Sequence, residues 1–343
     1  METTTKRLEP YQLLEQRLAE WMGYHPSQIV SCSSGTAALH LALEALQLSP
    51  VSEVGMSDFN MIACPRATVM AGLRPVFYDC DDRLNLDCGY IPQFGPEVPE
   101  VVMPVHIYGR RCNMEAVMDA MCNSPDDKFR QYVVEDMSEL HGVKPHALSD
   151  AACWSFYRNK IVAGEEGGAV VFHNREHAAH ARQLRSLGFT EAHDFMHVPG
   201  GHNYRMSNVH ALLILESLKN YEWNARERRN IELMYNDLCP IEWRMPERQA
   251  VWVYDFRIPG LTNELQTSIV KTLNSKGIAA RHAFKPMSIQ PEFRQQYPLV
   301  HNPVAAQAAR EVIYLPVQPG VTTETIAKRS FEIIQQALDS SKK

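Results

Sequence analysis

The first 205 residues of this 343-residue chain alternate short apolar segments with longer amphipathic ones. The short segments have the length of buried strands, whereas the longer ones repeat apolar residues with the period of a helix. This alternation predicts a mostly parallel sheet that is covered by helices on both faces. We expect seven strands in this region, at residues 28–31, 53–56, 75–79, 100–106, 132–135, 152–157 and 169–173. The expected helices between them are 36–46, 64–71, 114–121 and 176–187.

The pattern changes after about residue 205. Residues 209–237 are typical of one long helix or two, and they are rich in Leu, Glu, Arg and Asn. Further short strands are expected at 252–257, 277–280 and 313–316, with helices near 265–275 and 323–338. The chain length also fits one large domain and a smaller one. We therefore predict an α/β fold with a large domain over residues 1–225 and a small C-terminal α+β domain over residues 226–343.

Composition excludes some classes of partner and site. The net charge of −6 offers no electrostatic reason to expect binding to nucleic acid or to an anionic membrane. The N-terminus has no apolar core of a signal peptide, and no run of 18 apolar residues exists, so we expect a cytoplasmic protein. His193 and His197 have the spacing of a zinc helix, but the glutamate of such a motif is missing. We interpret the spacing as chance and expect no metal site.

Chemically active residues stand where predicted strands end. Asp136 closes one strand, Lys160 follows the next, and a turn of small residues at 33–36 precedes the first long helix. In parallel sheets, ligands bind beyond the carboxyl ends of the strands, so these residues should share one edge. Taken alone, a lysine in a loop is more often a solvated charge, and a turn of this kind is more often a helix N-cap.

Together, however, the lysine and the aspartate can converge on a small aromatic cofactor such as pyridoxal phosphate (PLP). Beside a pyridine nitrogen, the ionised carboxylate of Asp136 would keep that nitrogen protonated, and the protonated ring accepts electrons from a carbanion. Burial would disfavour the ammonium form of Lys160, so that its free amine could form a Schiff base and then move a proton. The sequence therefore favours a PLP enzyme.

In their order along the chain, these segments resemble the DegT/DnrJ/EryC1/StrS family of sugar aminotransferases, within the fold-type I PLP enzymes. The similarity runs from Glu15 to about Leu338 and is most specific in the lysine and Asn-x-Arg-Met segments. The segments that carry it are 34–43 (Ser-Gly-Thr-Ala-Ala-Leu-His-Leu-Ala-Leu), 135–136 with 141–142 (Glu-Asp and His-Gly), 155–160 with 166–168 (Ser-Phe-Tyr-x-x-Lys and Glu-Gly-Gly), and 201–206 (Gly-x-Asn-Tyr-Arg-Met).

The resemblance implies a role for each matching residue. Lys160 would form the internal aldimine with PLP, and Asp136 would bind the pyridinium nitrogen. The phosphate would be bound by Gly35, Thr36 and Ala37 in the turn and by the hydroxyl of Ser155. Asn203 would reach the phosphate of the neighbouring subunit, which implies a homodimer with shared active sites.

The implied reaction is ping-pong transamination. An amino donor, usually glutamate in the family, would convert PLP to pyridoxamine phosphate, and a nucleotide-linked keto-sugar would then take the amino group. Relatives that act as dehydratases replace the lysine by histidine, so the presence of Lys160 favours transamination.

The chain also departs from the family pattern. Glu139 stands where a glutamine or histidine is usual, and Met61 stands where an aromatic ring usually stacks on the cofactor. Ser288 and Gln318 replace histidines that border the sugar site, and the loop over 143–149 is short. Glu139 would be protonated, or turn elsewhere, or alter the cofactor's electronics, and Met61 is equally typical of a plain core residue.

These departures keep two other functions open. One is a PLP enzyme of another reaction type, such as a decarboxylase or dehydratase. The other is a PLP-binding or partner-binding protein with little turnover. The substitutions near the sugar site also suggest an unusual amino acceptor, whereas the cofactor residues Asp136, Ser155, Lys160 and Asn203 are all retained.

Overall fold

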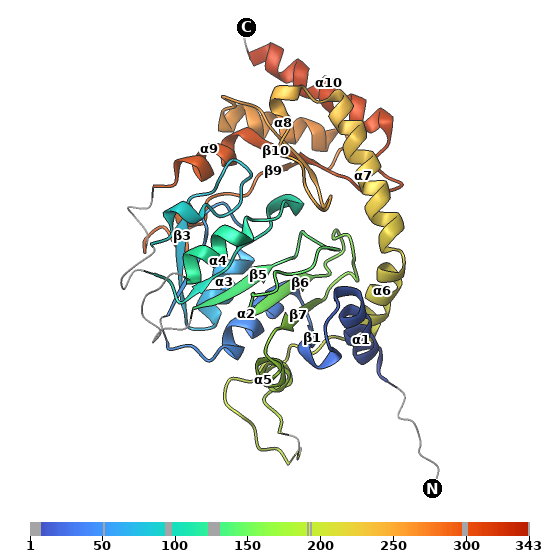
Figure 1. The fold of residues 1–343 in the computed structure, drawn as a ribbon. Coiled ribbons are helices and arrows are strands. Elements are labelled where there is room, and N and C mark those ends of the chain that lie inside the picture. The colour runs from blue at the N-terminus through green and yellow to red at the C-terminus, as the bar shows by residue number, and fades with distance from the viewer. Residues whose placement is uncertain are drawn as a thin grey trace.

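The computed structural model describes residues 8–50, 52–92, 98–122, 131–190, 192, 194–296 and 301–341. Its larger sheet has seven strands in the order β1-β7-β6-β5-β4-β2-β3 (Figure 1). Strand β7 runs antiparallel to β1 and β6, and all other neighbours are parallel. The predicted mostly parallel sheet is therefore confirmed. Its strands are β1 (Ile29–Cys32), β2 (Glu53–Ser57), β3 (Arg74–Tyr78), β4 (Val101–Val102), β5 (Tyr132–Asp136), β6 (Ala151–Ser155) and β7 (Gly168–Phe172).

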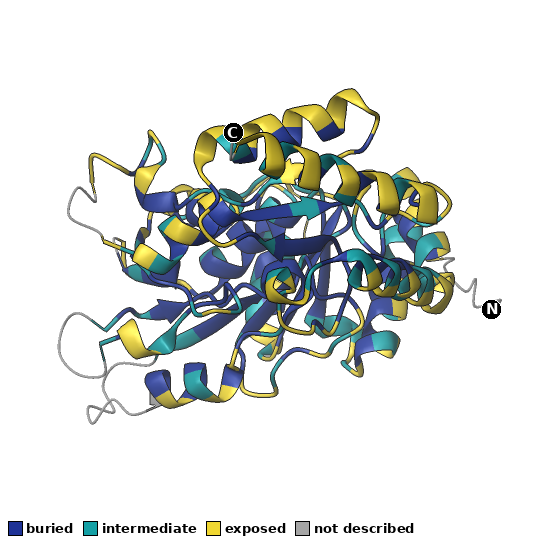
Figure 2. Ribbon diagram, turned by 90° about the horizontal axis from the view of Figure 1, so that it is seen from above, coloured by how far each residue is buried: buried dark blue, intermediate teal, exposed yellow. Residues whose placement is uncertain are grey.

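Alternating residues of the central strands pack into two separate cores, one on each face of the sheet. In β6, Ala151 and Cys153 belong to one core, and Ala152 and Trp154 belong to the other. The first core is formed with α2 (Gly35–Ala45), α3 (Ala63–Met70) and α5 (Arg175–Arg185). The second is formed with α1 (Pro10–Met22) and α6 (Asn208–Lys219), and α4 (Met114–Cys122) packs on Val102 and Val133. Figure 2 shows the result of this layering: the strands are buried, and the helices that cover them are partly exposed.

A second, three-stranded sheet of order β8-β10-β9 lies at the C-terminal side of the molecule (Figure 1). The long helix α7 (Tyr221–Leu238) leads to it, and its core includes residues of α8 (Asn263–Ser275) and α10 (Glu324–Ser341). Its strands are β8 (Tyr254–Arg257), β9 (Arg281–His282) and β10 (Val312–Leu315). Helix α9 (Pro303–Glu311), which precedes β10, was not predicted from the sequence.

Two strands differ most from the predictions. The expected strand at 277–280 is wrong, because Gly277 is in the left-handed region (φ +81°) and the N–H of Ile278 closes helix α8 on the carbonyl of Leu273. The strand therefore begins only at Arg281. Strand β4 has two residues instead of the seven expected. For residues 209–237, where one long helix or two were expected, the structure has two, α6 and α7, which are separated at Asn220.

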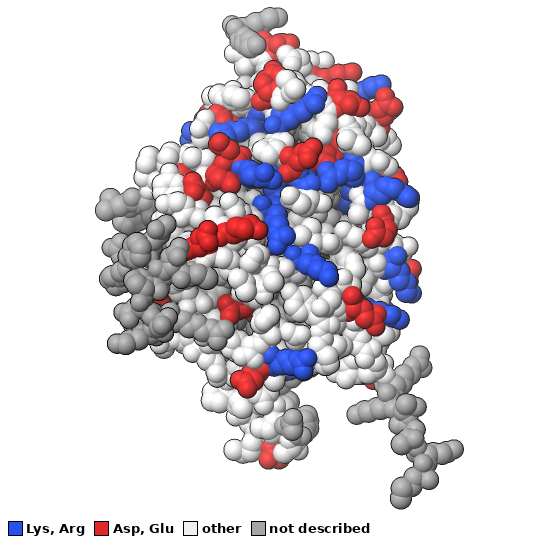
Figure 3. Space-filling model, viewed as in Figure 1, with Lys and Arg blue, Asp and Glu red and all other residues white. Residues whose placement is uncertain are grey.

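The predicted domain boundary at residues 225 and 226 falls within α7, and we retain the division into two domains as a proposal. Acidic and basic side chains are interspersed over the face shown in Figure 3. In the part of the chain that the structure describes, no helix is both long and apolar enough to cross a membrane. His193, of the predicted chance pair with His197, lies outside the described residues.

Candidate active site

A cavity of about 320 Å³ lies where the carboxyl ends of β5 and β6 meet the start of α2. Asp136 is the last residue of β5, Ser155 is the last residue of β6, and Lys160 lies in the loop that follows. The opposite wall comes from the C-terminal part of the chain. Among the predicted site residues, those that line the cavity are Gly35, Thr36, Met61, Asp136, Glu139, Ser155 and Lys160, and the aromatic residues beside them include Tyr157, Trp252, Phe284 and Tyr314.

The N-terminus of helix α2 forms the part of the cavity that suits an anion. A Cβ atom on Gly35 would lie 2.6 Å from the Cβ of Ser155, so glycine is needed for the helix to approach β6 this closely. Backbone N–H groups and the helix dipole at such an end attract phosphate. The N–H of Ala37 is already used, since it donates to the N-capping Oγ of Ser34 at 3.1 Å, and Ala37 does not line the cavity.

Asp136 is held in the floor of the cavity by two donors. Its Oδ1 accepts from the backbone N–H of Ser138 at 2.9 Å, and its Oδ2 accepts from the thiol of Cys64 at 3.2 Å. Burial, together with the charge of Asp136, raises the pKa of Cys64 well above its usual value, so the sulfur keeps its proton and remains a donor. The carboxylate is 4% exposed and can bond a protonated ring nitrogen.

The amine of Lys160 lies between a carboxyl group and an aromatic ring. Its Nζ is 3.9 Å from Oε1 of Glu139 and 3.9 Å from the ring centroid of Trp252. The side chain is 10% exposed, and burial lowers the pKa of Lys160 although Glu139 and Asp136 oppose that shift. A lowered pKa increases the share of free amine, which is the nucleophilic form.

Arg228, on helix α7, positions the lysine loop. Its guanidinium donates to the carbonyl of Trp252 at 3.0 Å and lies within 3.4 Å of the carbonyls of Asn159 and Lys160. Sequence reasoning missed both Arg228 and Trp252. No local pattern distinguishes them, because they approach the loop from distant parts of the chain.

Glu139 points toward Lys160 instead of turning away. Its Oε2 accepts from the backbone N–H of Tyr108 at 2.6 Å, and its side chain is 6% exposed. Burial raises the pKa of Glu139 to about 7, against the attraction of Lys160. Near neutral pH the group can therefore exist as a carboxylic acid, which donates a hydrogen bond as a glutamine would.

Replacing Glu139 by glutamine should remove one ionisation near pH 7 from the pH dependence of kcat/KM. In the wild type, ionisation above that pH abolishes the donor and favours the ammonium form of Lys160, so activity should fall as the pH rises through about 7. The variant should instead have a flat profile there. An unchanged profile in Glu139→Gln would show that another group titrates. The control is Glu222→Gln, an exposed position on α7, which should keep the wild-type profile.

The two remaining predicted residues lie differently. Met61 is 46% exposed and forms part of the cavity wall, so a stacking role stays a prediction. Asn203 is exposed and does not line the cavity of its own chain. A single chain therefore brings together every predicted site residue except Ala37 and Asn203.

The residues present fit PLP. A buried amine, a fixed carboxylate, a helix N-terminus and an aromatic wall face one cavity. With the mostly parallel seven-stranded sheet, they define a fold-type I PLP enzyme. The chain belongs to the DegT/DnrJ/EryC1/StrS aminotransferase family, whose sequence model matches residues 3–330. It is a PLP-dependent aminotransferase.

Curated relatives and solved structures agree with this assignment. The chain is 29% identical to GDP-perosamine synthase of Caulobacter vibrioides over 81% of this chain and 77% of that one. It is 28% identical to UDP-N-acetyl-3-dehydro-alpha-D-glucosamine 3-aminotransferase of Acidithiobacillus ferrooxidans, over 87% of this chain and 81% of that one. The structure of Helicobacter pylori PseC, an aminotransferase of pseudoaminic acid biosynthesis, has the same fold, with a TM-score of 0.84 and 20% sequence identity. The superposition covers 98% of this chain and 94% of that one. The family, fold and cofactor expected from the sequence are therefore confirmed.

Proposed function

We propose that this enzyme transfers an amino group from an amino acid, most simply glutamate, to a keto-sugar linked to a nucleotide. The observation that carries the proposal is the buried amine of Lys160, which shares a cavity with Asp136. The named relatives support the acceptor class, since they include enzymes of GDP-linked and UDP-linked sugars. We assign the cofactor contacts to Gly35, Thr36, Asp136, Ser155 and Lys160.

These residues have distinct chemical tasks. PLP, when bound, delocalises the electron pair that remains after the substrate carbon loses a proton. Lys160 holds the cofactor at rest, and its Nζ then accepts and returns that proton, for which burial favours the free amine. Asp136 keeps the ring nitrogen protonated. The start of α2 and the hydroxyl of Ser155 bind the phosphate, and Trp252 excludes water from one side of the amine.

Two half-reactions test this function. Adding glutamate to the PLP-loaded enzyme should shift its visible absorbance and release a keto acid, and a nucleotide-linked keto-sugar should restore the first spectrum. If no amino acid shifts the spectrum, the enzyme is not a transaminase. Release of carbon dioxide or water without a keto acid would instead identify a decarboxylase or dehydratase, and binding without any turnover would identify a PLP-binding protein.

We further propose that the enzyme is a homodimer in which Asn203 binds the phosphate in the neighbouring active site. Support comes from the position of Asn203, which is exposed and separate from its own cavity. A backbone bridge to Ser186 holds its segment in place, so the side chain is presented from a fixed strand-like stretch. The phosphate would then be bound from both subunits.

Mixing two inactive variants should restore activity if the sites are shared. A dimer of one Lys160→Ala chain and one Asn203→Ala chain would contain one site with both substitutions and one intact site. Refolding the two together in equal amounts should give about a quarter of wild-type activity, because half of the dimers are mixed and each has one working site. Activity that stays at the level of the separate variants would contradict a shared site.

A further inference from the structure

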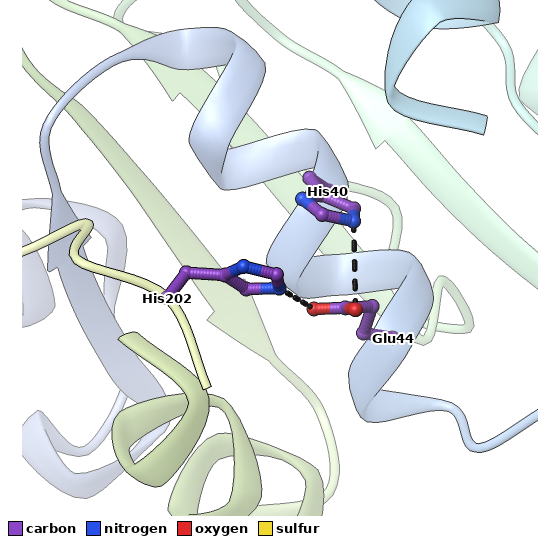
Figure 4. A group of neighbouring side chains, drawn as sticks. All are labelled: His40, Glu44 and His202. Carbon is purple, nitrogen blue, oxygen red and sulfur yellow. Dashed lines mark hydrogen bonds and ion pairs between the residues drawn. The ribbon is translucent and has the colours of Figure 1, made fainter. Parts of the chain in front are cut away.

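Three metal-ligating side chains converge away from the cofactor cavity. His40 and Glu44 lie one turn apart on helix α2, and His202 approaches from the segment before Asn203 (Figure 4). His202 Nε2 is 2.7 Å from one carboxylate oxygen of Glu44, and His40 Nε2 is 3.5 Å from the other. One ligand atom from each residue lies within 4.8 Å of those of the other two.

His40 is the member of this cluster that its protein neighbours leave incomplete. Its side chain is 2% exposed, and apart from the 3.5 Å contact with Glu44 its Nε2 has no hydrogen-bond partner among the described residues. Its Nδ1 lies 3.1 Å from the hydroxyl of Tyr204. Metal-binding histidines are usually arranged in this way, with one ring nitrogen bonded to an outer group and the other directed at the ion. A buried ring nitrogen without a partner is costly, and a bound cation would satisfy it.

The chain holds the third ligand in a fixed position. The N–H of His202 donates to the carbonyl of Leu184 at 2.6 Å, and its carbonyl accepts from the N–H of Leu187 at 2.8 Å. Its ring stacks on that of Tyr204, with centroids 4.7 Å apart. His202 therefore approaches Glu44 from an anchored backbone, and only small ring movements separate the present arrangement from coordination.

The donor set indicates the class of ion. Two imidazoles and one carboxylate suit zinc and related divalent transition metals, and calcium and magnesium prefer oxygen ligands alone. Tetrahedral zinc would place its ligand atoms about 3.4 Å apart, close to the separation of His40 from Glu44. A smaller cavity of about 190 Å³, lined in part by Glu44, His180 and Pro199, lies beside the cluster and offers a route for the ion and room for a water ligand.

We propose that His40, Glu44 and His202 form a zinc-type divalent metal site. The ion would cross-link helix α2 and the segment that carries Asn203. The first turn of α2 also lines the cofactor cavity. The site is separate from the proposed transamination and does not depend on it. Its role is structural, because none of the three ligands lines the cofactor cavity.

Cobalt(II) and zinc binding to tag-free, chelator-treated holoenzyme test the proposal. Wild-type protein should take up one equivalent per chain, with cobalt bands typical of tetrahedral coordination and a melting temperature raised by zinc. His202→Ala and Glu44→Gln should each weaken binding by about 100-fold, whereas His301→Ala, at an exposed histidine outside the cluster, should not.

A milder variant keeps the test valid if a ligand replacement impairs folding. Tyr204→Phe retains the ring that stacks on His202 but removes the hydroxyl beside His40, so binding should weaken by about tenfold. Absence of saturable cobalt binding by the wild type would overturn the proposal. Equal affinities of the wild type, His202→Ala and Tyr204→Phe would overturn it as well, since the metal would then bind elsewhere.

Discussion

Lys160→Ala should reduce kcat by about 10⁴-fold or more, because the enzyme would lose both its covalent attachment to PLP and its proton carrier. The visible band of the lysine-bound cofactor should disappear, although PLP can still be retained through Asp136 and the phosphate contacts. The structural reason is that the groups beside the amine cannot replace it as a nucleophile. It is buried against Trp252, and the neighbouring carboxyl of Glu139 cannot attack an aldehyde carbon.

Absorbance spectra and steady-state rates of the purified variant measure both effects. Lys144→Ala is the matched control, since Lys144 is an exposed lysine that does not line the cavity, and it should retain wild-type spectrum and rate. If Lys160→Ala kept the band, a different lysine would hold the cofactor and the site would have to be placed elsewhere. If it lost the band but kept its rate, Lys160 would not move the proton.

Asp255→Ala should lower the free energy of unfolding by about 3–5 kcal/mol, because it would leave two arginines buried without their shared carboxylate. Arg110 bonds both oxygens of Asp255, at 3.0 and 2.6 Å, and Arg248 bonds Oδ1 at 2.6 Å. All three side chains are at most 3% exposed. The effect should extend to the active site, because Arg110 follows closely on Tyr108, whose N–H binds Glu139.

The pH dependence of this loss has a defined sign. Burial by itself would raise the pKa of Asp255, but the two guanidinium groups outweigh it and lower the pKa below 3.8. A group whose pKa falls on folding contributes stability above its unfolded value and loses it in acid. The difference between wild type and Asp255→Ala should therefore persist at neutral pH and shrink only as the pH falls below 3.8.

Urea unfolding of the PLP-free protein, followed by tryptophan fluorescence and circular dichroism, measures the change. Asp339→Ala removes an exposed carboxylate of α10 and should alter stability by less than about 0.5 kcal/mol. A loss below about 1 kcal/mol in Asp255→Ala would mean that Glu232 and nearby carbonyls can satisfy both arginines.

Prediction from sequence succeeded where the signal was local. Asp136 and Lys160 could be placed at one edge because each follows an apolar strand, and parallel strands bring their carboxyl ends together. The turn at Gly35 could be recognised because its small residues directly precede an apolar helix. The strand at 277–280 was misplaced because apolar residues there close helix α8 instead of pairing with β10.

The amino-acid sequence by itself determined the layered fold, the family and the paired lysine and aspartate, since periodicity and short motifs are local properties of the chain. Only the tertiary structure decided what surrounds that pair. It brought Trp252 and Arg228 to the lysine loop, turned Glu139 toward the amine, and placed His202 beside His40 across more than 150 residues. The physical reason is that burial and long-range contacts, which set the pKa of Lys160 and Glu139, exist only once the chain is packed.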